Sequence, residues 1–170
     1  MSVEILKAIV LAEKHVFFMY CMLLIAAIAQ DKRVSSLVIG IFVLCASQAL
    51  AVGVTPTLYQ LSTPLGIAYK FIWYGFWLLT NLMFVWMIYQ LHIIQQARVT
   101  LTTKAISLQI VLNSLFHTLD FTGRATFDSH IFAAVYQIAI PALTVGIVPV
   151  ILLTWCYEYR NKLSIAAAGA

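Results

Sequence analysis

Five polar residues recur along one stretch of the chain at spacings that place them on one side of a helix. At 100° per residue, these residues fall within a sector of about 80°; they are Gln109, Asn113, His117, Asp120 and Arg124. The set combines an acid, a base and an imidazole that titrates near neutral pH. Such groups can pass protons or hold a polar ligand. The spacing therefore predicts a polar pathway or a binding face on this helix.

The same face also has a purely structural interpretation. Amides, imidazoles and carboxylates are costly to expose to lipid, so the face must meet protein or water. Hydrogen bonds between such side chains also hold membrane helices together. The sequence alone leaves the pathway and the structural interpretation open.

Histidines offer a different chemistry, because imidazole nitrogen binds zinc, copper and haem iron. We expect His15, His117 and His130 near the same side of the membrane, where they are weak candidates for a metal site. The spacing of Asn113, His117 and His130 is similar to that of the copper triad in one subunit of the copper membrane monooxygenases. His15 and His117 could also bind a haem iron as its two axial ligands. The cofactor stays unknown, with metal or haem as alternatives.

Catalytic motifs find no support in the sequence. It contains no G-x-S-x-G, C-x-x-C, H-E-x-x-H or glycine-rich phosphate loop. The cysteines Cys21, Cys45 and Cys156 are widely spaced inside apolar runs, which excludes a disulfide scaffold and fits small apolar side chains. We therefore expect no catalytic residues, and a protein that is non-enzymatic or only indirectly catalytic.

The composition shows what kind of element must carry these residues. The 170-residue chain is 63% hydrophobic and 9% charged, with a mean hydropathy of +0.97. Soluble domains are about half apolar and a quarter charged. The net charge of +4 comes from scattered residues and not from a basic face, which excludes nucleic-acid binding. The predicted fold class is all-α, a polytopic integral membrane helical bundle.

The charge-free stretches predict where the helices lie, because a span needs roughly 20 apolar residues. We expect about five transmembrane helices in a single domain, 1–165, at positions 5–29, 34–54, 67–94, 102–121 and 131–157. The first is interpreted as a retained helix and not as a cleaved signal peptide. Thr55-Pro56-Thr57 is expected to open the second connection, and Gly123 to cap the fourth helix. Residues 166–170 are interpreted as a linker or an appended tail.

The distribution of positive charge predicts the orientation in the membrane. The first and third loops and the C-terminus share one side, which carries six basic residues: Lys32, Arg33, Arg98, Lys104, Arg160 and Lys162. Positive charge on short loops marks the cytoplasmic side. We therefore expect the N-terminus outside and the C-terminus in the cytoplasm, in a bacterial-type inner (plasma) membrane.

Three functions fit these features. The first is a small transport, channel or proton-coupled component that uses the polar face of the fourth helix. The second is a non-catalytic accessory or interaction subunit of a membrane complex, including an immunity or exclusion factor. The third is a metal- or haem-bearing redox subunit. Expected partners are the lipid bilayer and further copies of the chain or other membrane subunits.

Three patterns of small residues spaced four apart allow two helices to approach closely: Ser36-x3-Gly40, Ala49-x3-Gly53 and Ala142-x3-Gly146.

Overall fold

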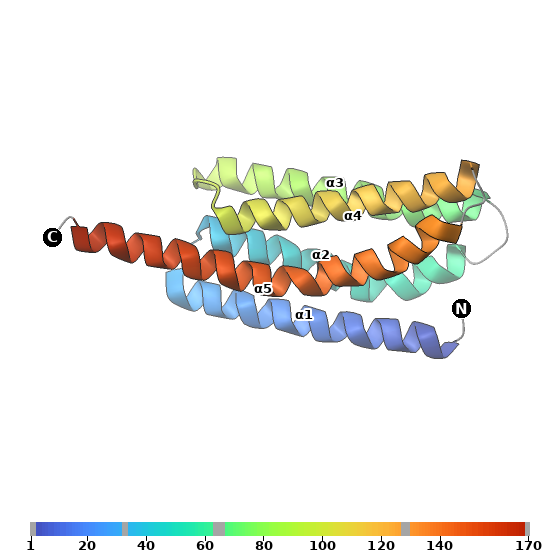
Figure 1. Ribbon diagram of the computed structural model, residues 1–170, viewed down its shortest axis with the longest axis horizontal. Helices are drawn as coiled ribbons and strands as arrows, with labels where there is room; N and C mark the ends of the chain where they lie inside the picture. The colour runs from blue at the N-terminus through green and yellow to red at the C-terminus, as the bar shows by residue number, and fades with distance from the viewer. Residues whose placement is uncertain (1–2, 32–33, 63–66, 127–129, 169–170) are drawn as a thin grey trace.

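The protein is an elongated bundle of helices (Figure 1). The computed structural model describes residues 3–31, 34–62, 67–126 and 130–168, and within these ranges the side chains from 11 to 164 except 67, 130, 131 and 133. The described residues form five helices and no strand, which confirms the all-α prediction. They are α1 (Val3–Asp31), α2 (Ser36–Ser62), α3 (Ile67–Gln95), α4 (Leu101–Thr126) and α5 (His130–Ala168).

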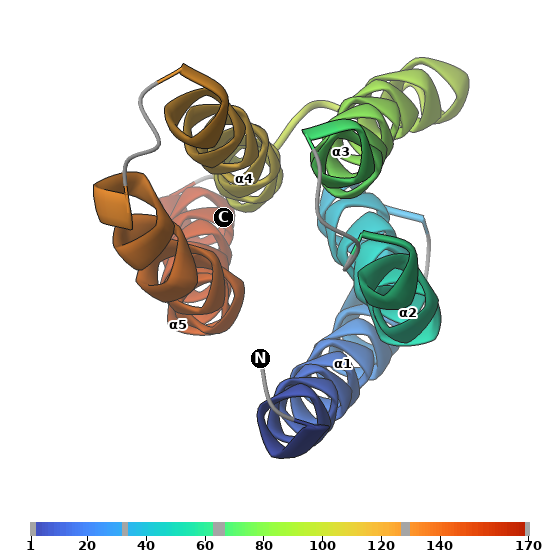
Figure 2. The same ribbon diagram turned by 90° about the vertical axis from the view of Figure 1, so that its right-hand side faces the viewer.

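Helices that follow one another in the chain pack side by side. α2 lies between α1 and α3, and α4 lies between α3 and α5, while α2 also contacts α4. Seen along the bundle, the helices form an incomplete ring with α1 and α5 at its two ends (Figure 2). The two termini lie at opposite ends of the bundle (Figure 1). Which end faces the cytoplasm stays a prediction.

Within the described residues, four helices are long and apolar enough to cross a membrane. The spans are Leu11–Asp31, Ser36–Ser62, Ala68–Gln95 and Ala134–Ser164. Large apolar side chains on their outer faces, such as Leu79 and Leu153, are about 70% exposed, as expected for surfaces that contact lipid. The fold is therefore that of a polytopic helical membrane protein. α4 lacks a span of this kind and instead packs against α2, α3 and α5.

Glycine allows α2 and α4 to approach closely at one point. A Cβ atom on Gly40 would lie 3.0 Å from Thr103 Oγ1 and 3.1 Å from Ile106 Cδ1. The predicted Ser36-x3-Gly40 pattern is therefore used within the bundle. The other two patterns are not, because no described atom lies within 4 Å of a Cβ built on Gly53 or Gly146.

Three helices extend well past the ends expected from the sequence. α2 continues through Pro56, and the buried Leu58 beyond it packs into the bundle. The prediction that Gly123 caps α4 is wrong, since this glycine lies inside the helix. A Cβ there would come 2.6 Å from Phe132, so Gly123 makes room for α5. α5 also includes 166–168, where alanine favours a helix.

Candidate functional site

The polar face of α4 is turned into the bundle. Gln109, His117 and Asp120 are only 6%, 5% and 1% exposed, while Asn113 and Arg124 are half-buried. The opposite face carries exposed leucine and valine side chains. α4 adopts this orientation because burying the polar groups against α3 and α5 avoids the cost of exposing them to lipid. The five residues of the predicted face are thus brought together along the interior.

Asp120 is the centre of a polar cluster at the end of the bundle where α4 ends. Its Oδ2 accepts a 2.5 Å hydrogen bond from the Tyr74 hydroxyl, and its Oδ1 accepts one of 3.0 Å from Arg124 Nε. The Asp120 side chain is fully buried, and that of Arg124 is 30% exposed. The arginine therefore balances the buried carboxylate charge with a charge-assisted hydrogen bond.

His117 lies one turn earlier, surrounded by aromatic rings. It stacks on Trp77 at 6.1 Å between ring centres, with edge contacts to Tyr74 and Tyr136. The Tyr136 hydroxyl lies 3.1 Å from His117 Nδ1 and accepts a hydrogen bond from Trp73 Nε1. The imidazole and the Asp120 carboxylate are thus joined to hydroxyl groups of α5 and α3, and both are groups that can exchange a proton.

A second polar cluster lies at the opposite end of the bundle, where α4 begins. His92 Nδ1 donates to the Ile88 carbonyl oxygen at 2.7 Å, and His92 Nε2 lies 2.8 Å from the Ser36 hydroxyl oxygen. Thr103 Oγ1 donates to the Ser36 carbonyl oxygen at 2.8 Å. Ser36, His92 and Thr103 are all buried and join α2, α3 and α4.

The start of α4 is capped by a carboxylate from α5. Glu158 Oε1 accepts hydrogen bonds from the backbone N–H groups of Leu101 and Thr102. The Thr102 hydroxyl also donates to Thr154 Oγ1 at 3.0 Å. A negative charge stabilises a helix N-terminus because it interacts with unpaired N–H groups and the helix dipole. Glu158 therefore fixes α5 to α4 at this end.

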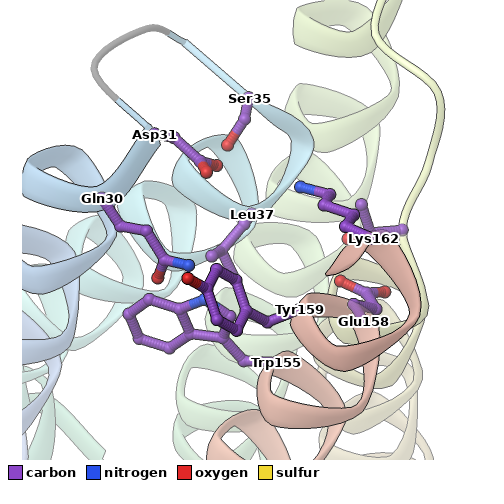
Figure 3. Close-up of a pocket in the computed structure, with 9 residues that line it drawn as sticks. Gln30, Asp31, Ser35, Leu37, Trp155, Glu158, Tyr159 and Lys162 are labelled. Carbon is purple, nitrogen blue, oxygen red and sulfur yellow. The ribbon is translucent and has the colours of Figure 1, made fainter. Parts of the chain in front are cut away.

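A small cavity adjoins this cap (Figure 3). Its volume of about 30 Å³ is enough for about one water molecule and too small for an organic substrate. Its lining is mostly polar and aromatic and comes from α1, α2, α5 and the residues just before α2 and α4. The lining residues are Gln30, Asp31, Ser35, Leu37, Thr100, Trp155, Glu158, Tyr159 and Lys162.

Between the two clusters, the interior contains amides without hydrogen bonds. Gln109 Oε1 and Asn113 Oδ1 are enclosed and have no partner among the described residues. The α3–α4 register is set by the Tyr74–Asp120 bond and the Trp77–His117 stack. The helices are antiparallel, so moving seven residues forward along α3 from Tyr74 and seven back along α4 from Asp120 keeps the same pairing. This places Asn81, which is only 8% exposed, opposite Asn113. The indole nitrogen of Trp77 is likewise enclosed and unpartnered.

The polar groups lie at depths that match a bilayer. Tyr74 and His92 are eighteen residues apart on α3, which corresponds to about 27 Å at the α-helical rise. This separation is close to the roughly 30 Å of a hydrocarbon core. Asn113 follows Thr103 by ten residues on α4, or about 15 Å. The unpartnered amides are therefore near mid-depth.

Whether the metal-site candidates His15, His117 and His130 come together stays a prediction. His15 is exposed on α1, and its Nδ1 lies 2.7 Å from the Leu11 carbonyl oxygen. His117 is instead buried among aromatic rings, and the His130 side chain lies outside the described residues. Within the described ranges, no group of three or more His, Cys, Asp or Glu side chains could hold a metal ion.

Several partners of the α4 face were missed by the sequence analysis. Tyr74 and Tyr136 were not expected to bind Asp120 and His117, although the sequence shows other aromatic residues three positions from Tyr74 and four positions from Tyr136. Glu158 carried no signal, because a cap from a distant helix has no local pattern.

No protein-family model, curated protein or solved structure matches the chain. The interpretation of the site therefore rests on its geometry.

Proposed function

We propose that the protein is a small membrane transport component in which protons pass along the buried face of α4. The observation that carries the proposal is the pair of unpartnered amide oxygens, Gln109 Oε1 and Asn113 Oδ1, near mid-depth. A buried polar group without a partner costs roughly 1–3 kcal/mol. A bundle that needed only to hold together would gain nothing from such groups, whereas water molecules that enter the pathway during conduction would satisfy them.

The groups at the two ends favour protons over metal cations. Asp120 is already paired with Arg124, so the cluster attracts a further cation only weakly. Carboxylate, imidazole and hydroxyl groups can each give up and accept a proton. The opposite end supplies the hydroxyls of Ser36 and Thr103 beside His92.

Two isoleucines interrupt the polar face towards the start of α4. Ile106 and Ile110 are 0% and 2% exposed, and Ile106 lies between Thr102 and Gln109. This apolar segment corresponds to a closed pathway, since it offers no hydrogen-bonding group to a proton. Conduction therefore requires α4 to move relative to α2 or α3 at this level.

Proton entry into liposomes tests the proposal. Purified protein is reconstituted around a pH-sensitive dye, and a potassium diffusion potential drives protons inwards. We expect faster acidification than in protein-free liposomes, and a loss of this excess in Asp120→Asn and His117→Ala. The matched controls are His15→Ala and Thr118→Val, whose side chains are exposed and bond only to their own helices. Equal rates in the wild type and both site variants would rule out the α4 pathway.

A second candidate function is an accessory subunit of a membrane complex. It is favoured by α5, whose C-terminal part extends beyond the ends of the other helices (Figure 1) and exposes Tyr157 and Leu163. A helix of 39 residues is about 58 Å long, more than one bilayer requires. Purification in mild detergent tests this function, which predicts a stoichiometric partner. A protein that always purifies alone contradicts it.

A further inference from the structure

We propose that Glu13 binds a monovalent cation, a proton or Na⁺, between α1 and α2. Glu13 lies in the candidate membrane span that begins at Leu11. Its Oε2 atom is enclosed by protein and has no hydrogen-bond partner among the described residues. The site is separate from the face of α4, because α1 packs on α2 and α5.

The polar contacts of Glu13 are few and long. Thr55 Oγ1 donates to Glu13 Oε1 at 3.4 Å, and Gln48 Nε2 donates to the Glu13 backbone carbonyl at 3.4 Å. Firm hydrogen bonds to oxygen are closer to 3 Å. The carboxylate therefore has one weak partner for its two oxygens. A charged carboxylate in this environment needs a proton or a cation to compensate it.

The positions beside Glu13 on the surface of its own helix carry no counter-charge. Side chains three and four residues away are the neighbours on a helix surface. At these positions the sequence has Ile9, Val10, Val16 and Phe17, all apolar. Lys14 is next in the chain and is exposed, so it points to a different side.

On the helices that pack on α1, no described side chain near Glu13 supplies a counter-charge either. α2 contains no acidic, basic or histidine residue in 36–62, and α5 contains none in 131–157. The other titratable side chains buried at these interfaces are Tyr20 and Cys45, both neutral at physiological pH. Among the described residues, ion pairing is recorded only between Arg124 and Asp120. Glu13 thus differs from Asp120 and from Glu158, which the α4 N-terminus stabilises.

The chemistry of the donors and the depth of the site fit a monovalent cation. The carboxylate and the Thr55 hydroxyl present oxygen atoms, which hard cations prefer as ligands. One carboxylate neutralises a single positive charge. Thr55 is nineteen residues from Ser36, about 29 Å along α2. Glu13 is therefore near the same membrane boundary as Asp120, where a cation from the aqueous phase can reach it.

Labelling with the membrane-soluble reagent dicyclohexylcarbodiimide tests the site. The acid O–H adds across a C=N bond of the reagent, and the adduct rearranges to a stable acylurea that peptide mass spectrometry locates. Only the protonated carboxyl reacts. We expect labelling of Glu13 at least about tenfold above that of Asp120 or Glu158, because Arg124 pairs with the first and the start of α4 binds the second, whereas Glu13 has no such partner among the described residues. Glu13→Gln should remove the label.

The two cations are distinguished by competition. If Na⁺ occupies the site, Na⁺ but not K⁺ will lower the labelling, and Thr55→Val will weaken that protection. If only a proton binds, labelling will fall as the pH rises and will not respond to Na⁺. Labelling of Glu13 no stronger than that of Asp120 at both acid and alkaline pH overturns the proposal. This readout uses the wild-type protein and is independent of proton flux along α4.

Discussion

Replacing the two central amides by apolar side chains of similar size is expected to stabilise the protein and to stop proton flux. The changes are Gln109→Met and Asn113→Leu. Each removes an enclosed oxygen that has no partner among the described residues, a group that costs roughly 1–3 kcal/mol. Imperfect packing of the new side chain offsets up to about 1 kcal/mol of this gain in stability. Gln109→Met should therefore raise the free energy of unfolding by about 1–2 kcal/mol.

Asn113→Leu should give a smaller gain, about 1 kcal/mol, because Asn113 is half-buried whereas Gln109 is only 6% exposed. Unfolding in mixed micelles of mild detergent and dodecyl sulfate, followed by circular dichroism, measures these differences. The matched control is Gln95→Met, an exposed position at the last residue of α3 where the amide can meet water; it should change stability by less than about 0.5 kcal/mol. A loss of stability in Gln109→Met would refute the reasoning, because it would show that the amide is bonded within the protein.

Three further predictions use the same unfolding assay. Gly40→Ala should destabilise by about 1–3 kcal/mol because its Cβ would meet Thr103 at 3.0 Å, whereas Gly53→Ala should be neutral or stabilising; equal effects would contradict the close α2–α4 contact. Tyr74→Phe should cost about 1–2 kcal/mol through the lost bond to Asp120, and no measurable cost would disprove that bond. Glu158→Gln should cost about 1 kcal/mol, with faster amide exchange at the start of α4; unchanged exchange would argue against the cap.

The helices were predictable because hydropathy and charge act over whole segments. A charge-free stretch long enough to cross a bilayer has few alternatives to a helix, since lipid cannot satisfy a bare backbone. Helix ends were less predictable. Pro56 and Gly123 are local breakers, yet the packing of Leu58 and Phe132 outweighs them.

The inward face of α4 was visible in the sequence because residues three and four apart share a side of a helix. The partners of that face were not. The contacts of Ser36 with His92, and of Tyr74 with Asp120, join residues 56 and 46 positions apart. Only the register between helices brings them together, and one sequence does not specify that register. In the sequence, Glu13 is one of several charged residues near the N-terminus, and its lack of a counter-charge is evident only once α2 is placed beside it.

Proton entry into liposomes that contain the wild type or the Gln109→Met/Asn113→Leu double variant, at equal protein content, tests the central claim most directly. The double variant leaves Asp120 and its partners in place and removes only the polar groups near mid-depth. The proposed pathway predicts that the wild type conducts above protein-free liposomes and that the double variant, folded and more stable, does not. Equal flux through both proteins, or none through the wild type, would contradict a proton pathway along α4.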